Sequence, residues 1–170
     1  LVLPGFQDAH VHPPFAGRNM ANLFLNDLAG REAYLAAIAA YADAHPERPW
    51  ILGGGWAMDA FPGGMPDKAD LDAIVPDRPV FLFNRDVHGA WVNSAALRIA
   101  GSDAGTPDPD DGRSERHPDG APTGMLHEGA AYSFNDRFVP LPDRAAWEEA
   151  ILLAQRHLHA LGITAWQDAW

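Results

Sequence analysis

Cysteine is absent from the 170-residue sequence. This absence excludes a disulfide framework and any metal site built on thiolates. A metal ion must therefore be bound by histidine, aspartate or glutamate side chains, which suit zinc and similar divalent ions.

Basic residues are also scarce, with 12 lysines and arginines against 23 acidic residues and a net charge of −11. Such a chain repels phosphate groups, so we exclude nucleic acid and membrane surfaces as partners. No apolar run approaches the roughly 20 residues of a membrane span. We expect a small-molecule substrate and a cytoplasmic location, and we leave a homo-oligomer open.

Apolar segments alternate with amphipathic ones along the chain, which favours α/β architecture with a parallel sheet. We interpret the glycine run at 53–55 as a turn and the Asp-, Gly- and Pro-rich stretch 102–123 as a surface excursion. The predicted strands cover residues 1–12, 80–83 and 163–167, and the predicted helices cover 31–45, 94–100 and 143–161.

Two histidines lie two residues apart at the end of the first predicted strand. Alternate side chains of a strand share a face, so Asp8, His10 and His12 point the same way and the two imidazoles can bind one ion. Pro13 and Pro14 close the strand directly afterwards. The alternative is two histidines that meet by chance, because an isolated H-x-H is weak evidence.

A second H-x-H pair, His157 and His159, lies in the predicted helix 143–161. Residues i and i+2 of a helix project to nearly opposite sides. These two side chains cannot share an ion, so we interpret them as ordinary helix residues.

Several stretches carry a family resemblance. The opening segment resembles the first strand of the amidohydrolase superfamily, and four later stretches resemble, in order, landmarks of amidohydrolase family 3, the YtcJ-like branch. The segments are LVLPGFQDAHVHP, GGGWAMDAFPGGMPDKADLD, PVFLFNRDVHGAWVNSAAL, DGAPTGMLHEGA and LGITAWQDA. They extend over nearly the whole chain.

The resemblance implies a (β/α)8 TIM barrel of the metal-dependent hydrolase type. A full barrel takes about 250 residues, so we expect residues 1–170 to be its N-terminal portion, with a long insertion at about 50–130 after the second strand. It also implies hydrolysis of non-peptide amide or related C–N bonds by a water activated by one or two divalent ions, with zinc expected. We expect a piece of a longer polypeptide, inactive in isolation.

The same resemblance implies a ligand set. His10 and His12 match the paired ligands of the first strand, and Glu128 matches the glutamate of a T-G-x-L-x-E stretch. The single lysine, Lys68, lies in a polar stretch that suits a buried bridging group poorly, so a bridging role falls to Glu128. An exposed loop glutamate is the alternative. The general-base aspartate is expected beyond Trp170.

Four further residues are candidates for supporting roles. His88 follows the predicted strand 80–83 and Trp56 follows the glycine run, so both are predicted to contact substrate. A loop hydrogen bond and core packing are the respective alternatives. Asp8 and Asp168 are predicted to orient their neighbours by hydrogen bonds from the second coordination shell, with strand packing as the alternative for Asp8.

Two competing functions remain. Phosphoesterases of the PHP type also open with a D-x-H-x-H strand, but they add further ligands soon afterwards. Here no histidine falls between His12 and His45, and no phosphate cradle is evident. The second alternative is a non-catalytic, metal-binding fragment of a larger enzyme.

Overall fold

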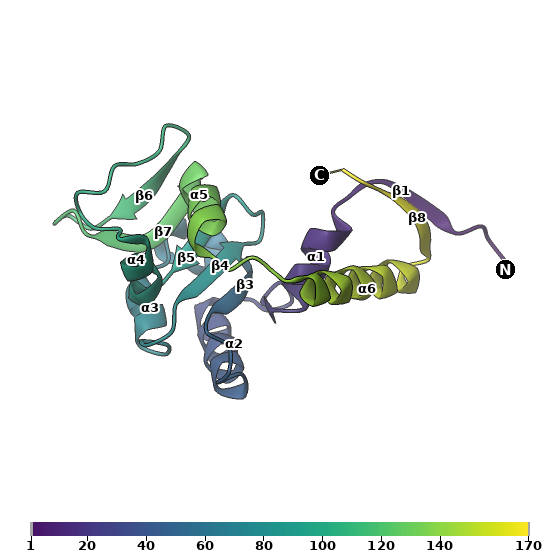
Figure 1. Ribbon diagram of the computed structural model, residues 1–170, viewed down its shortest axis with the longest axis horizontal. Coiled ribbons are helices and arrows are strands. Elements are labelled where there is room, and N and C mark those ends of the chain that lie inside the picture. Colours follow the sequence, from purple (N-terminus) through teal and green to yellow (C-terminus); the bar gives the residue numbers. More distant parts are fainter. Residues whose placement is uncertain (1, 170) are drawn as a thin grey trace. The chain divides into compact units, whose positions relative to one another are not determined.

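The computed structural model describes residues 2–169 and divides them into two compact units (Figure 1). The first unit contains residues 2–22 and 141–169, and the second contains residues 23–140. None of the helices within residues 2–169 is long and apolar enough to cross a membrane.

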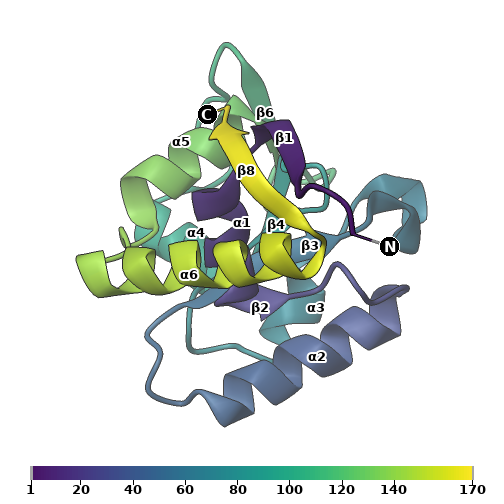
Figure 2. The same ribbon diagram turned by 90° about the vertical axis from the view of Figure 1, so that its right-hand side faces the viewer.

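The first unit joins the two ends of the described chain. Strand β1 (Phe6–Val11) pairs in parallel with β8 (Ile163–Asp168), and helix α1 (Pro13–Met20) packs along α6 (Arg144–Ala160). Figure 2 shows β1 beside β8. The unit is therefore a two-stranded parallel sheet with one helix from each end of the chain.

Helix α6 confirms the predicted helix 143–161. Asp143 caps it, because its side chain accepts a hydrogen bond from the backbone N–H of Ala146. Gly162 follows the helix with a φ of 80°, the left-handed conformation that glycine adopts readily.

The spacing of apolar residues in α6 predicts one buried face, and the structure buries only part of it. The predicted residues are Trp147, Ile151, Ala154, Leu158 and Leu161. Ala150, Ala154 and Leu158 are buried, whereas Ile151 and Leu161 are 45 % and 57 % exposed. The reason is a close helix contact: a Cβ at Gly17 of α1 would lie 1.8 Å from the carbonyl oxygen of Ala150. Small residues therefore form this contact.

The first predicted strand is shorter and more exposed than expected. Leu1 lies outside the described residues, β1 begins at Phe6, and Phe6 is 60 % exposed. The prediction of a buried strand is wrong, because β8 is the one neighbour of β1 within residues 2–169. Pro13 and Pro14 also begin helix α1, where the fixed φ of proline suits the first turn.

The second unit is built on a six-stranded mixed sheet of order β2-β3-β4-β5-β7-β6. The β2–β3 and β3–β4 pairs are parallel, and the β4–β5, β5–β7 and β6–β7 pairs are antiparallel. The strands are β2 (Leu23–Phe24), β3 (Ile51–Trp56), β4 (Val80–Asn84), β5 (Gly89–Val92), β6 (Gly112–Arg116) and β7 (Pro122–Glu128).

Four α-helices and two short 3-10 turns complete this unit. They are α2 (Arg31–Ala44), α3 (Lys68–Asp72), α4 (Ser94–Ala100), α5 (Gly129–Phe138), η1 (Met58–Ala60) and η2 (Pro62–Gly64). The predicted helices 31–45 and 94–100 are confirmed as α2 and α4. The α/β class is confirmed, whereas the partial barrel and the insertion at about 50–130 stay predictions.

Aromatic side chains form the centre of the core of the second unit. The rings of Trp56, Phe61 and Trp91 meet edge to face, with centroids 5.1–6.2 Å apart. The indole N–H of Trp56 donates to the carbonyl oxygen of Leu82 at 2.9 Å. Trp56 is fully buried, so its side chain is a structural anchor of this core.

The prediction of a turn at residues 53–55 is wrong, because all three glycines lie inside β3. A Cβ at Gly54 would lie 2.5 Å from the carbonyl oxygen of Phe83, and one at Gly53 would lie 2.1 Å from that of Leu23. The glycines therefore permit close approach to both neighbouring strands. The predicted excursion 102–123 likewise contains strand β6 and the start of β7.

Substitution of Gly54 tests this close approach. We expect Gly54→Ala to lower the free energy of unfolding by about 1–3 kcal/mol, since the added methyl group meets backbone that cannot yield easily. Gly105→Ala is the control, because its Cβ would meet only the Asp103 side chain at 3.5 Å. Urea unfolding followed by circular dichroism measures both variants, and equal stability of the two would contradict the packing argument.

Candidate functional site

His10 and His12 lie next to each other at the end of β1. Their ring centroids are 5.4 Å apart and the ring planes make an angle of 74°. Two imidazoles that bind one tetrahedral ion at a metal–nitrogen distance of about 2.0–2.1 Å have ring centres about 5 Å apart. The spacing of this pair therefore fits two ligands of one divalent ion.

The end of β1 is irregular. The pairing with β8 shifts register between Asp8 and Val11, which is a bulge or a similar irregularity. Such irregularities turn side chains out of the strict alternation of a strand. His12 follows the strand as the N-cap residue of α1, so the pair lies at a junction between strand and helix.

Each of the two predicted supporting aspartates lies beside one histidine. Asp8 Oδ1 accepts a hydrogen bond from the backbone N–H of His10 at 3.0 Å. Asp168 Oδ1 lies 3.7 Å from His12 Nδ1. A carboxylate at Nδ1 favours the tautomer that offers Nε2 to a metal ion. The Asp168–His12 distance is that of an ion pair and is longer than a hydrogen bond, so the orienting role of Asp168 stays a prediction. Asp8 contacts the backbone.

Within residues 2–169, no group of three or more histidine, aspartate and glutamate side chains is arranged to hold a metal ion. His10 and His12 belong to the first unit, and Glu128 belongs to the second. The roles of these three residues as metal ligands stay predictions.

Glu128 instead forms a cluster with His88 and Tyr132. His88 Nδ1 lies 3.0 Å from Glu128 Oε2, and the Tyr132 hydroxyl donates to the same oxygen at 3.3 Å. The Tyr132 hydroxyl also lies 3.2 Å from His88 Nδ1. We call these three residues the Glu128 cluster.

Three elements bring the Glu128 cluster together. His88 lies in the turn between β4 and β5, Glu128 ends β7, and Tyr132 lies in the first turn of α5. The backbone N–H of Glu128 donates to the carbonyl oxygen of His88 at 2.9 Å, which fixes the turn against the strand. Sequence reasoning missed Tyr132; its signal is the spacing of four residues from Glu128 at the start of a helix.

The charges of the cluster support each other. The hydrogen bond and the negative charge of Glu128 raise the pKa of His88. The hydrogen bond from His88 lowers the pKa of Glu128, and Tyr132 lowers it further. The imidazolium–carboxylate form is therefore favoured over a wider pH range than in the separate residues.

The backbone at this place is unusual. Glu128 has φ 49° and ψ −124°, and Val87, next to His88, has φ 67°. A positive φ is uncommon outside glycine and costs about 1–3 kcal/mol per residue where it is strained. Among residues 2–169 these are the two non-glycine residues with a positive φ, and each adjoins or belongs to the Glu128 cluster. The surrounding fold therefore holds this geometry against a local cost.

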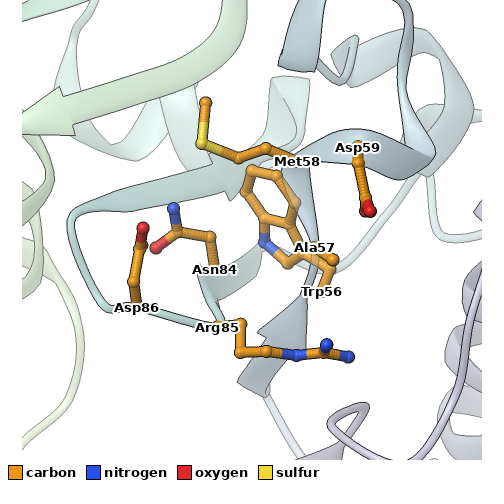
Figure 3. Close-up of a pocket in the computed structure, with 7 residues that line it drawn as sticks. All are labelled: Trp56, Ala57, Met58, Asp59, Asn84, Arg85 and Asp86. Atoms are coloured by element: carbon orange, nitrogen blue, oxygen red, sulfur yellow. The ribbon is translucent and has the colours of Figure 1, made fainter.

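A separate pocket of about 340 Å³ lies where β3 and β4 end (Figure 3). It is close to the lower limit of small-molecule sites. Arg85 donates from its guanidinium to the carbonyl oxygen of Asn26 at 3.0 Å. The lining residues are Trp56, Ala57, Met58, Asp59, Asn84, Arg85 and Asp86. Trp56 lines this pocket from the buried core, and its contact with substrate stays a prediction, as does that of His88.

A sequence model described as the amidohydrolase family matches residues 1–170. The exoenzymes regulatory protein AepA of Pectobacterium carotovorum subsp. carotovorum is 35 % identical over 98 % of this chain and 37 % of its own length. The Bacillus subtilis (strain 168) protein YtcJ, which carries the name of an amidohydrolase, is 35 % identical over 96 % of this chain and 31 % of its own length.

A third relative is the N-substituted formamide deformylase of Arthrobacter pascens, which is 31 % identical over 99 % of this chain and 32 % of its own length. Among solved structures, an uncharacterized metal-dependent hydrolase from Pyrococcus furiosus aligns with a TM-score of 0.61 and 26 % identity, over 96 % of this chain and 31 % of that chain. The chain thus spans about a third of the length of these relatives.

The pKa of His88 tests the geometry of the Glu128 cluster. We expect it to lie above the ordinary value of 6.5, and Glu128→Gln to lower it. Because the pKa of His88 is raised, the stabilising attraction is lost as the pH rises through that pKa. Because the pKa of Glu128 is lowered, it is also lost as the pH falls through the pKa of Glu128.

Histidine-detected NMR titration of the wild type and the Glu128→Gln variant measures this shift. His157 in α6 provides the internal reference signal, because it lies in the other unit. A His88 pKa that does not respond to the loss of the carboxylate charge would show that the two side chains do not interact in solution.

Proposed function

We propose that this chain, which belongs to the amidohydrolase family, provides part of the active site of a metal-dependent hydrolase. The proposed enzyme hydrolyses carbon–nitrogen bonds. The proposed substrates are non-peptide amides or related compounds. The family match favours this function over a phosphoesterase of the PHP type.

The observation that carries the proposal is the histidine pair at the end of β1. The ring spacing of 5.4 Å fits a shared ion, and Asp168 lies 3.7 Å from the Nδ1 atom of His12. Zinc is commonly bound by neutral imidazoles, and a carboxylate commonly accepts a hydrogen bond from the ring nitrogen that does not bind the metal. We therefore propose zinc held by His10 and His12. The role of Glu128 as a carboxylate ligand stays a prediction.

Two relatives support the proposal. The Pyrococcus furiosus protein that shares the fold is described as a metal-dependent hydrolase. The Arthrobacter pascens relative is named for removing a formyl group from N-substituted formamides, and such compounds contain an amide C–N bond. From this relative we infer for this chain only the type of bond that is hydrolysed, and no particular substrate.

The chemistry follows from the donor atoms. A bound divalent ion supplies a Lewis acid that polarises a carbonyl group and lowers the pKa of a water molecule. Asp168 orients His12 by its position at Nδ1. His10 and His12 would bind the ion through the nitrogen of a neutral imidazole. We assign binding and orientation to this chain, and no proton-transfer step.

Replacement of the histidine pair tests the proposal. We expect His10→Ala/His12→Ala to lower the affinity for Zn²⁺ at least tenfold and to abolish hydrolysis across a panel of N-substituted amides by the full-length protein that carries this segment. Metal content after dialysis and release of the amine product measure the two effects. His157→Ala/His159→Ala is the matched control, because it removes an identical sequence pattern from a helix.

Each other outcome has a definite meaning. Zn²⁺ affinity that is unchanged by loss of His10 and His12 contradicts the metal site. Metal binding without hydrolysis of any amide or formamide supports the alternative of a non-catalytic metal-binding chain. Hydrolysis of phosphate esters in place of amides contradicts the proposed bond type.

A further inference from the structure

We infer that the pocket at the ends of β3 and β4 binds a small organic cation that also carries a carbonyl group, such as an amino amide. Asn84 donates a hydrogen bond to the carbonyl oxygen, and the carboxylates of Asp59 and Asp86 attract the ammonium group. The residues that line the pocket all belong to the second unit, so the inference does not rest on the histidine pair or on the proposed function.

The pocket lies at a place in the sheet where ligands commonly bind. Trp56 ends β3 and Asn84 ends β4, and these two residues are partners in the parallel β3–β4 register. Open α/β sheets bind ligands outside the carboxyl ends of parallel strands. The volume of about 340 Å³ admits a small molecule (Figure 3).

The pocket contains a buried amide with an unused hydrogen-bond donor. Asn84 is only 3 % exposed, and its Oδ1 accepts a hydrogen bond from the backbone N–H of Gly89 at 3.0 Å. That bond identifies the oxygen of the amide, so the remaining group is the donor Nδ2. Among residues 2–169, Nδ2 donates to no acceptor. A buried donor without a partner is unfavourable, and the carbonyl oxygen of a ligand supplies that partner.

The rim of the pocket favours positive charge. Asp59 and Asp86 are exposed, and neither forms an ion pair in the part of the chain that the structure describes. Figure 3 shows Asp86 to the left of the Trp56 ring and Asp59 to its right. The guanidinium of Arg85 donates instead to the backbone carbonyl oxygen of Asn26 at 3.0 Å. The two carboxylates therefore attract a cationic ligand and disfavour an anionic one.

A purely structural role of the amide is the alternative. In that case Asn84 only holds the β4–β5 turn through its bond to Gly89, and the pocket has no preference among small molecules. Ligands of matched shape distinguish the two roles without any substitution of Asn84, because each ligand lacks one of the groups that the pocket would recognise.

The test compares matched ligands on the full-length protein that carries this segment. Protonated glycinamide carries both the ammonium group and the carbonyl group. Propionamide replaces the ammonium group by methyl, and isobutylammonium replaces the amide oxygen and nitrogen by methyl groups. Malonamate places a carboxylate where glycinamide has its ammonium group. Saturation-transfer NMR of the ligands measures the dissociation constants.

We expect glycinamide to bind about fivefold more tightly than propionamide, which is the effect of a favourable exposed ion pair. Isobutylammonium should also bind about fivefold more weakly than glycinamide, because it leaves the donor of Asn84 without a partner. Malonamate should bind most weakly of the set, because its carboxylate meets the negative charge of the rim.

Substitutions locate the ligand on the protein. Asp59→Asn/Asp86→Asn should remove the preference for glycinamide over propionamide. Asp43→Asn/Asp77→Asn is the matched control, because it removes two carboxylate charges from exposed positions outside the pocket and should leave the preference unchanged. Thermal unfolding of both variants verifies that they are folded.

Each other result overturns a part of the inference or all of it. Equal affinities for glycinamide and propionamide overturn the role of the carboxylates, and equal affinities for glycinamide and isobutylammonium overturn that of Asn84. A preference that survives Asp59→Asn/Asp86→Asn overturns the location. Tightest binding of malonamate, which indicates an anion site at Arg85, or no binding of any ligand overturns the whole inference.

Discussion

The hydrogen bonds between β1 and β8 are the constraint on which the candidate metal site depends. They join two segments that are separated by about 150 residues, and the register places Val11 beside Asp168. The backbone N–H of Ala169 continues the pairing by donating to the carbonyl oxygen of Val11 at 3.0 Å. This pairing brings the Asp168 carboxylate to 3.7 Å from the Nδ1 atom of His12.

The second unit shows how a rigid core permits a strained surface. The buried rings of Trp56, Phe61 and Trp91 and the close contact at Gly54 hold the sheet in one arrangement. The positive φ of Glu128 occurs at the end of β7, which belongs to the same sheet. The exposed Glu128 cluster is therefore positioned by the elements that carry it, which are the β4–β5 turn, β7 and α5.

The two H-x-H pairs show why secondary structure decides what a motif can do. His10 and His12 end a strand, and their rings lie 5.4 Å apart. His157 and His159 lie in α6, where side chains two residues apart project to nearly opposite sides of the helix. His159 contacts the ring of Trp166, with centroids 6.2 Å apart, and so takes part in packing. The same three-letter pattern brings two imidazoles together at the end of a strand in one place and separates them along a helix in the other.

The sequence alone determined the local elements and the family. Helices α2 and α4 and the Asp143 cap follow from periodicity and capping within a few residues, and the ordered motifs identify the amidohydrolase family. Only the tertiary structure decided that the glycine run is a strand and that His88 meets Glu128, 40 residues away. Those features depend on which distant backbone approaches, and neither periodicity nor local spacing encodes such an approach.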